Sequence, residues 1–352
     1  DTLPQKLAAS LKKRAIELGL HACNLPEEVG GGGLDAVSVM LIEKELGRTS
    51  LALAECAHRP LNILASCEGE QVTKFLEPTI RGEKRDCIAM TEPGAGSDLR
   101  GMKCKAVLEK DEWIINGEKH FISQASISDY CVLFAATGED ETDKGLKKRI
   151  SAFLVDFNDH GVEVAPGYKN VSHRGYTNNI LRFDNARIPR WRIMGPEGDG
   201  FRIVNQWLGP TRLTVAATCV ARAERAFEIA LNYSATREQF GQKIGKFQGI
   251  SFELADMATE IKMANLMLLE TAWKIDQGSV TPEDCAMTKL FCSEMLSRVA
   301  DQSIQTVGGM GLMEDLPLER IWRDARLERI WDGTSEIQRH IISRGLLRPL
   351  EK

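Results

Sequence analysis

Hydrophobic positions divide the chain into three stretches of different periodicity. Up to about Arg85 the apolar residues, beginning with Leu3 and Leu7, recur at the spacing of amphipathic helices, and no stretch alternates with a period of two. We therefore expect an all-helical N-terminal domain over residues 1–85. The glycine run 30–33 contains a GxGxxA string but follows no strand, which favours an interhelical loop over a dinucleotide-binding turn.

Residues 86–198 change to short β-branched and aromatic stretches separated by turn residues. The expected strands are 104–109, 113–122, 130–135, 150–157, 161–164 and 180–183. The first two are expected to form a hairpin. The charged residues 139–149 favour a solvated loop between two strands. This segment predicts an antiparallel, β-barrel-like middle domain.

Helical periodicity returns at Gly200 and continues over long stretches. The expected helices are 201–235, 246–277, 281 to at least 299, and 334–347. Thr281 begins a strong start signal, because its hydroxyl can cap the first turn and the proline after it suits the first helical position. Residues 199–352 therefore predict a helical bundle. The order helix, sheet, helix makes the fold α+β and argues against a doubly wound nucleotide-binding fold.

Composition excludes several classes of function. The chain has 352 residues, 43% of them hydrophobic, and a net charge of -5, so it offers no basic surface for nucleic acid. No apolar run reaches the roughly 20 residues that a membrane span needs. Nine cysteines without a CxxC pair indicate buried thiols in a reducing compartment. The histidines lack metal-ligand spacing, so no metal site is expected.

Five motifs occur in series and together span most of the chain. They are Thr91-Glu-Pro-Gly-Ala-Gly-Ser-Asp98, Asn116-Gly-Glu-Lys-His-Phe-Ile-Ser123, Arg237-Glu-Gln-Phe-Gly-Gln-Lys-Ile-Gly-Lys-Phe-Gln248, Gln305-Thr-Val-Gly-Gly-Met-Gly311 and Arg329-Ile-Trp-Asp-Gly-Thr-Ser-Glu-Ile-Gln-Arg339. In this order they resemble the acyl-CoA dehydrogenase superfamily. The resemblance implies a helical N-terminal domain, a middle β-barrel-like domain and a C-terminal four-helix bundle, and relative to that pattern the first helix is absent.

The resemblance also implies FAD as the cofactor. Met90, Thr91 and Ser97 would line the isoalloxazine, where nearby glycines let the backbone approach a planar ring. Phe121 and Ser123 lie two apart on one predicted strand, so both would face the flavin. The family commonly has Trp and Thr at these two positions. Phe keeps the apolar cover, and Ser keeps the hydroxyl.

The remaining cofactor contacts are implied for the C-terminal segment. Arg237 and Phe240, three apart near a predicted helix end, would share one face and, with Gln248, meet the FAD pyrophosphate and adenine. The residues that would come from a neighbouring subunit are Gln305 and Gly309. Those that would close the site are Thr334 and Glu336. The protein is therefore expected to be a homo-oligomer, in the family's manner a dimer of dimers.

Asp332 stands where the family most often has a catalytic glutamate. In α,β-dehydrogenation a carboxylate removes the α-proton of an acyl-CoA while the β-hydrogen leaves as hydride to flavin N5, giving the 2-enoyl-CoA. A backbone N–H at the base position helps to hold the thioester oxygen. Asp is one methylene shorter than Glu, a deficit of about 1.5 Å. By resemblance Arg212 lies near this carboxylate and the CoA, and Ser97 also lies near the CoA.

Three functions are compatible with this resemblance. The first is an acyl-CoA dehydrogenase of fatty acid β-oxidation that passes electrons to an electron-transfer flavoprotein. The second is a flavin oxidase like the nitroalkane oxidases of the same superfamily, which also have Asp at this position. The third is a catalytically silent FAD-binding subunit of a heteromeric dehydrogenase. The expected location is the cytoplasm in a bacterium, and the mitochondrial matrix or peroxisome in a eukaryote, where an upstream targeting segment would fit a chain that begins at Asp1.

Overall fold

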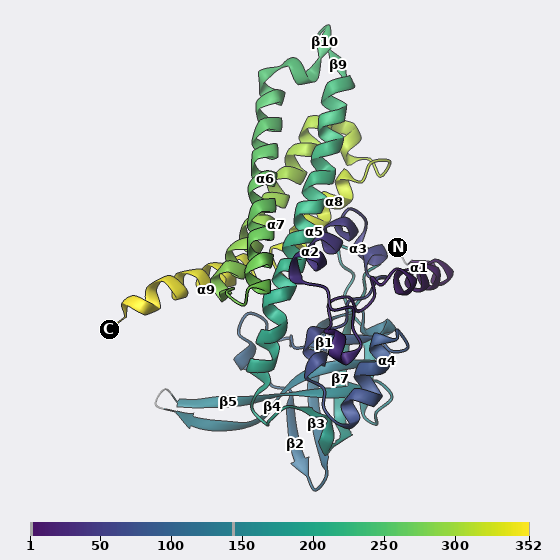
Figure 1. Cartoon of the computed structure of the whole chain (residues 1–352), viewed down its shortest axis with the longest axis vertical. Helices are drawn as coiled ribbons and strands as arrows, with labels where there is room; N and C mark the ends of the chain where they lie inside the picture. Colours follow the sequence, from purple (N-terminus) through teal and green to yellow (C-terminus); the bar gives the residue numbers. More distant parts are fainter. Residues whose placement is uncertain (1–2, 143–144, 352) are drawn as a thin grey trace. The chain divides into compact units, whose positions relative to one another are not determined.

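The chain folds into two compact units in the computed structural model, which describes residues 3–142 and 145–351. One unit comprises residues 1–34, 55–170 and 174–208, and contains the sheet (Figure 1). The other comprises residues 35–54, 171–173 and 209–352, and contains the long helices. Helices come first, a sheet follows and a helical bundle ends the chain, which confirms the predicted fold class. Each unit combines several separate segments of the chain, so the two units do not test the predicted domain boundaries at 85/86 and 198/199. These boundaries stay a prediction.

The N-terminal segment contains no strand among the described residues 3–85, as its periodicity predicted. Its helices are α1 (Gln5–Glu17), α2 (Ala36–Gly47), α3 (Leu51–Ala54) and α4 (Glu77–Ile80). The glycine run before α2 is a tightly bonded loop. A Cβ on Gly31 would lie 2.2 Å from the carbonyl oxygen of Leu25, so the backbone approaches too closely for any side chain. The run therefore forms a closely packed loop before α2, as predicted.

Eight described strands form one sheet. They are β1 (Asp86–Ala89), β2 (Lys105–Glu109), β3 (Glu112–Ser123), β4 (Tyr130–Thr142), β5 (Gly145–Asp156), β6 (Val162–Pro166), β7 (Asn178–Pro189) and β8 (Ile193–Met194). Their order is β6-β7-β3-β2-β4-β5-β8, and β1 pairs with β4 in parallel. The predicted hairpin of β2 and β3 is confirmed, with Glu109 opposite Glu112. The other neighbours are antiparallel apart from a short parallel contact of β2 with β4.

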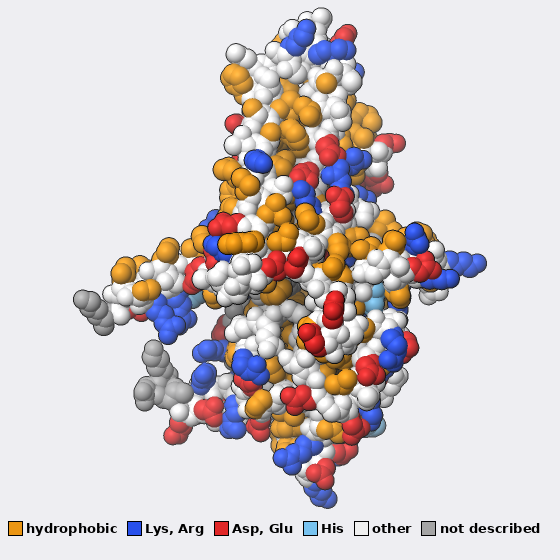
Figure 2. Space-filling model, viewed as in Figure 1, with side chains coloured by type: hydrophobic (Ala, Val, Ile, Leu, Met, Phe, Trp, Pro, Cys, Tyr) orange, Lys and Arg blue, Asp and Glu red, His pale blue; other side chains and the backbone are white. Residues whose placement is uncertain are grey.

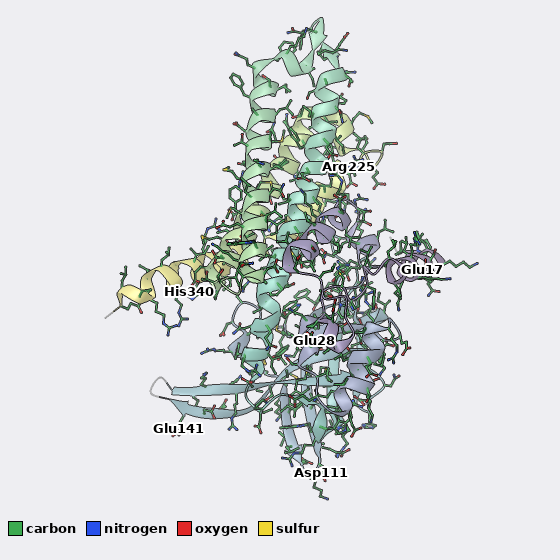
Figure 3. The ribbon with its side chains drawn as sticks, in the orientation of Figure 1. Glu17, Glu28, Asp111, Glu141, Arg225 and His340 are labelled. Atoms are coloured by element: carbon green, nitrogen blue, oxygen red, sulfur yellow. The ribbon has the colours of Figure 1, made fainter. Side chains whose placement is uncertain are left out.

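The charged residues 139–149 are not a loop, so that expectation was wrong. They extend β4 and β5 into one long hairpin, of which residues 143–144 lie outside the described part (Figures 1 and 3). Glu139 pairs with Lys148 and Asp140 with Lys147 across the two strands. Opposite charges on facing positions stabilise a solvent-exposed strand pair. Pairs of opposite charge across the hairpin therefore stabilise these strand ends, which have no apolar periodicity.

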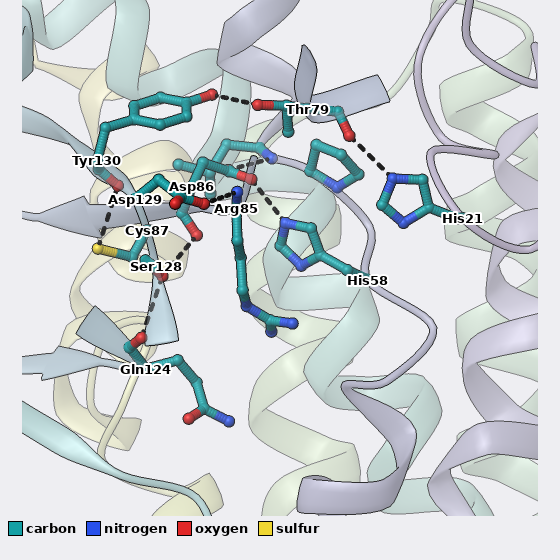
Figure 4. Close-up of polar contacts among 12 residues, drawn as sticks. His21, His58, Thr79, Arg85, Asp86, Cys87, Gln124, Ser128, Asp129 and Tyr130 are labelled. Atoms are coloured by element: carbon teal, nitrogen blue, oxygen red, sulfur yellow. Dashed lines mark hydrogen bonds and ion pairs between the residues drawn. The ribbon is translucent and has the colours of Figure 1, made fainter. Parts of the chain in front are cut away.

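Buried polar contacts join the N-terminal segment to the sheet within the first unit (Figure 4). The Asp86 carboxylate at the start of β1 accepts hydrogen bonds from His58 Nε2 at 2.6 Å and from the backbone N–H of Leu61 at 2.8 Å. The hydroxyls of Thr79 and Tyr130 lie 2.8 Å apart. Because each buried group has a partner, these contacts fix the loops before β1 without leaving a desolvated charge.

The bundle is built from long helices with a core rich in alanine. They are α5 (Gly200–Thr236), α6 (Gln248–Asp276), α7 (Pro282–Val307) and α9 (Ser335–Leu347), together with the shorter α8 (Leu318–Glu328), which the hydrophobic periodicity did not reveal. Thr281 caps α7, as the sequence predicted, and the side chain of Asp284 completes a reciprocal capping box. Small buried residues such as Ala216, Ala223 and Ala264 allow close helix packing. The nine cysteines are unbridged, and no described helix could cross a membrane.

Candidate active site

Asp332 lies in the tight turn between α8 and α9. Its φ is +52°, and that of the following Gly333 is +92°, so two successive residues adopt the left-handed conformation. Asp tolerates this region better than most residues, yet it still costs free energy, and such strain is concentrated at functional positions. Thr334 then caps α9, its hydroxyl accepting from the N–H of Ile337 at 3.2 Å. The turn thus presents Asp332 in a conformation that the surrounding contacts must hold.

Buried donors hold the carbonyl groups of this turn. The side-chain amide of Gln338 donates to the carbonyls of Asp332 at 3.2 Å and Gly333 at 2.9 Å. Lys289 Nζ donates to the Gly333 carbonyl at 2.9 Å. Arg212 Nε makes a longer contact of 3.5 Å with the Asp332 carbonyl. Both cations therefore bind backbone oxygens beside the Asp332 carboxylate, and they come from α5 and α7.

The surroundings make Asp332 a stronger base than an ordinary aspartate. Burial raises the pKa of its carboxyl to about 6, against the opposing positive charges of Lys289 and Arg212, while the negative charge of Glu328 adds to the rise. Burial also lowers the pKa values of Lys289 and Arg212. A carboxylate that is still ionised at neutral pH but has a raised pKa suits proton abstraction.

Glu328 is close to Asp332 in sequence but is committed to other partners. It is completely buried and accepts hydrogen bonds from Arg222, from His173 Nε2 at 3.0 Å and from Trp331 Nε1 at 2.7 Å. Burial acts to raise its pKa, but the Arg222 charge and these hydrogen bonds outweigh that effect and lower it. Glu328 is therefore no competitor for the role of base.

Sequence reasoning missed this set of buried groups and Lys289. His173 lies between β6 and β7 along the chain, but residues 171–173 belong to the compact unit of the bundle. His173 and Glu328 are 155 positions apart. No periodicity or motif spacing links residues at that separation, so only the folded chain could reveal the contact.

In the first unit, two of the predicted flavin-binding segments lie side by side. Lys119 on β3 is wholly buried, and its Nζ donates to the carbonyl of Met90 at 2.9 Å and to the Glu92 carboxylate at 2.8 Å. The N–H of His120 donates to the carbonyl of Thr91 at 2.8 Å. These bonds fix the loop after β1 against β3. Ser97, further along this loop, is exposed.

Phe121 presents an aromatic surface on this unit. A bulge between Lys119 and Ile122 interrupts the pairing of β3 with β7, and Phe121 has a φ of +56° and a side chain that is 58% exposed. The Tyr168 ring, also exposed and not predicted from sequence, lies 5.5 Å away between centroids. Ser123, two residues on, is half-buried.

These features fit a planar ring. A Cβ added to Gly94 or Gly96 would meet no atom within 4 Å, so the loop's backbone is open. Exposed aromatic rings and accessible backbone groups are the features that the flavin of FAD requires.

Another group of predicted residues follows the end of α5. Arg237 and Phe240 do not share a helix face, so that expectation was wrong. The helix α5 ends at Thr236, Arg237 links it to the hairpin of β9 (Glu238–Gln239) and β10 (Gln242–Lys243), and Phe240 lies in the turn of that hairpin. Phe240 and Gly241 form its two-residue turn with φ values of +51° and +77°. Phe240 is 93% exposed. The hairpin therefore presents its aromatic tip to solvent.

The remaining predicted residues are distributed over three helix ends. Gln248 is the first residue of α6, Gln305 lies in the last turn of α7, and Gly309 lies in the 3-10 turn Gly308–Leu312. Glu336 is in the first turn of α9. All four are exposed, so they are available to a ligand or a partner subunit. Their roles stay predictions.

Three family models match the chain in succession. They are the N-terminal domain of acyl-CoA dehydrogenase at residues 3–83, its middle domain at 87–186 and its C-terminal domain at 198–347. Short-chain specific acyl-CoA dehydrogenase of Homo sapiens is 37% identical over 346 residues, covering 97% of this chain and 83% of that protein. A probable acyl-CoA dehydrogenase of Bacillus subtilis is 37% identical over 343 residues, covering 96% and 89%.

Solved structures agree with these matches. Butyryl-CoA dehydrogenase from Megasphaera elsdenii superposes with a TM-score of 0.88 at 30% identity, covering 99% of this chain and 91% of that chain. An acyl-CoA dehydrogenase from Bacillus anthracis complexed with FAD gives 0.87 at 30% identity, covering 98% and 62%. The chain therefore belongs to the acyl-CoA dehydrogenase family, oxidoreductases that act on a CH–CH bond.

Proposed function

We propose that Asp332 is the base of an FAD-dependent acyl-CoA dehydrogenase that converts an acyl-CoA to the 2-enoyl-CoA. The observation that carries this proposal is the Asp332 carboxylate itself, whose pKa burial raises to about 6 beside Lys289 and Arg212. Bound FAD supplies the acceptor for the β-hydride. Asp332 removes the α-proton, and the neighbouring cations stabilise the negative charge that its carboxylate carries before the transfer.

The backbone at Asp332 supports a second role. None of the hydrogen bonds found within residues 3–142 and 145–351 uses the Asp332 N–H, whereas its carbonyl is held by Gln338 and Arg212. This N–H is thus available to the thioester oxygen, where charge develops as the α-proton leaves. Arg212 and Ser97 are proposed to bind the CoA part of the substrate.

The cofactor contacts are proposed for each unit separately, from groups that are exposed or half-buried. In the first unit, the residues proposed for the isoalloxazine are Met90, Thr91, Ser97, Phe121 and Ser123. In the second, Arg237, Phe240 and Gln248 are proposed for the pyrophosphate and adenine, and Thr334 and Glu336 for closing the site. Gln305 and Gly309 are proposed to reach the FAD of a second subunit, which requires a homo-oligomer.

The surface of the bundle supports an oligomer. Large apolar side chains of α6 are exposed, and Figure 2 shows hydrophobic side chains over this helix. They are Phe252, Met263, Leu266 and Trp273. An apolar face of this kind on a helix is typical of a protein interface. We further propose an electron-transfer flavoprotein as electron acceptor, since a 32% identical relative is named as a subunit of a caffeyl-CoA reductase–Etf complex.

The shorter base limits the substrate. Asp332 reaches about 1.5 Å less far than a glutamate, and misplacing a reacting group by about 1 Å can cost on the order of 100-fold in rate. The α-carbon is therefore proposed to lie closer to the turn, or to be more acidic than in a plain straight-chain acyl group. The variant Asp332→Glu should then shift the preferred substrate among acyl-CoAs of different size.

Anaerobic mixing with a panel of short, long, branched and aryl acyl-CoAs tests the reaction. Reduction of the flavin, seen as loss of its visible absorbance, is expected with at least one of them, and Asp332→Asn should slow it by on the order of 1,000-fold or more. Full activity of Asp332→Asn would refute Asp332 as the base. No reduction by any acyl-CoA, combined with oxygen uptake on nitroalkanes, would indicate an oxidase instead.

A further inference from the structure

Trp331, the residue immediately before Asp332, is held at both its edge and its face. Its indole Nε1 donates to Glu328 Oε2 at 2.7 Å. Its ring stacks on His173, with 5.2 Å between centroids and 20° between planes. A hydrogen bond and a stacking contact acting on one side chain leave it little rotational freedom. The backbone that leads into Asp332 is therefore attached to a fixed ring.

The groups that hold Trp331 are themselves buried and mutually paired. Glu328 Oε1 accepts from Arg222 and from His173 Nε2 at 3.0 Å, and the backbone N–H of His173 donates to Asp324 Oδ1 at 2.5 Å. The side chains of His173 and Glu328 are fully buried, and that of Arg222 is 3% exposed. Burial acts to lower the pKa of His173, but the carboxylate of Asp324, 3.5 Å from its Nδ1, and the hydrogen bond to Glu328 outweigh burial and raise the value.

Such a cluster is rigid for an energetic reason. Buried charges are costly unless each keeps its partners, so any rotation of Glu328 or His173 would leave a charge unpaired in the interior. The cluster draws on α5, α8 and the segment 171–173, all in the second compact unit. It therefore forms a fixed support for the residue before Asp332, while Lys289 and Gln338 hold the carbonyls of the turn itself.

We propose that Trp331 is a positioning residue for the base, clamped by Glu328 and His173 so that Asp332 keeps its left-handed conformation. This inference rests on the proposed function of Asp332. The need for it follows from geometry. A short side chain on a strained backbone has few rotatable bonds with which to correct an error, so the backbone must be placed accurately.

Exchange of the α-proton isolates the step that Trp331 should affect. The thioester 3,3-dimethylbutanoyl-CoA has α-hydrogens but no β-hydrogen, so it can exchange with deuterium oxide but cannot be dehydrogenated. Deuterium uptake by the flavin-loaded protein, followed by mass spectrometry, reports the base alone. Trp331→Phe keeps a ring to stack on His173 and loses the indole N–H, whereas Trp331→Leu loses both.

We expect the exchange rate to fall about tenfold in Trp331→Phe and about 100-fold in Trp331→Leu, with the dissociation constant of the thioester changed less than about threefold. Trp322→Phe is the matched control. It sits on α8, is 47% exposed and loses an indole hydrogen bond to Asp301 of 3.0 Å. Its exchange rate should equal that of the wild type.

The outcomes separate the two claims. Wild-type exchange that is slowed in both Trp331 variants supports the inference. If both Trp331 variants exchange as fast as the wild type and differ from it only by a lower melting temperature, Trp331 is merely structural and the inference is overturned. No exchange by the wild type would instead contradict the proposed base. If Trp331→Leu does not fold, Trp331→Phe alone decides the question.

Discussion

Lys289 Nζ donates a hydrogen bond to the carbonyl oxygen of Gly333 at 2.9 Å, and Lys289 is completely buried. The acceptor is neutral, so the ammonium charge is not cancelled at this contact. The charge lowers the pKa of Asp332 against the effect of burial. One lysine therefore both fixes the turn and sets how much of the base is ionised.

The activity of the wild type should depend on this ionisation. Asp332 must be deprotonated to accept the α-proton, and its pKa is about 6. We expect kcat/KM to be constant above about pH 7 and to fall tenfold per pH unit below about pH 6. The measurement is the pH dependence of kcat/KM with an acyl-CoA that reduces the flavin. An acid limb near pH 4 would contradict the effect of burial.

Replacing Lys289 should move that acid limb. In Lys289→Met the positive charge is gone, so the pKa of Asp332 should rise and kcat/KM should begin to fall at a higher pH than in the wild type. The same pH profile measures the shift. Lys13→Met, which removes an exposed lysine of α1, is the control and should leave the profile in place. A shift to lower pH would refute the role assigned to Lys289.

Removing the charge of the base should stabilise the fold. The raised pKa of Asp332 means that the folded state disfavours the ionised carboxylate at neutral pH. The free-energy cost of the ionised Asp332 carboxylate is fully present above its pKa in the folded protein. This cost disappears as the pH falls below the pKa of an ordinary aspartate, near 4. At pH 7.5 the free energy of unfolding of Asp332→Asn should therefore exceed that of the wild type by on the order of 1 kcal/mol, so the variant should unfold at a higher temperature. Near pH 4 the two should differ little. Calorimetry at both pH values checks this, and equal stability at pH 7.5 would contradict it.

Phe121 should trade backbone strain against cofactor binding. Because the φ of Phe121 is +56°, Phe121→Gly should relieve backbone strain. The free energy of unfolding of the protein without FAD should stay the same or rise by roughly 1 kcal/mol at most, and the melting temperature should follow it. The exposed ring would be lost, so FAD should dissociate at least about tenfold more readily. Lys110→Gly has the same φ of +56° in an exposed turn and should leave FAD binding unchanged. Flavin fluorescence titration measures both variants, and unaltered FAD affinity of Phe121→Gly would exclude Phe121 from the site.

Asp86 should stabilise the first unit in a pH-dependent way. Burial acts to raise its pKa, but the His58 hydrogen bond and the Leu61 N–H outweigh burial and lower it. A lowered carboxyl pKa contributes stability above its ordinary value near 4, which is lost as the pH falls through the folded value. Asp86→Asn should cost about 2 to 4 kcal/mol at pH 7. Asp111→Asn, at the exposed tip of the β2–β3 hairpin (Figure 3), should cost almost nothing in the same urea titration.

The pattern of the sequence determined the kind of element and its order. The switch from helical to alternating periodicity located the sheet, and the capping signal at Thr281 located the start of α7. Both are local properties, because a helix or strand must bury one face whatever it packs against. The charged end of the β4–β5 hairpin could not be predicted in this way. Its facing side chains are opposite charges exposed to solvent, so no alternation of apolar and polar residues indicates a strand there.

The sequence by itself also identified the family and the position of the base, because five motifs in a fixed order and Asp332 can be read along the chain. Only the tertiary structure decided what surrounds that base. Lys289, His173 and Arg222 act on the turn through space, and neither their burial nor their distance from Asp332 has a sequence signature. The pKa of a carboxyl depends on burial and on charges within a few ångströms, which come from segments far apart in the chain and meet only when it folds.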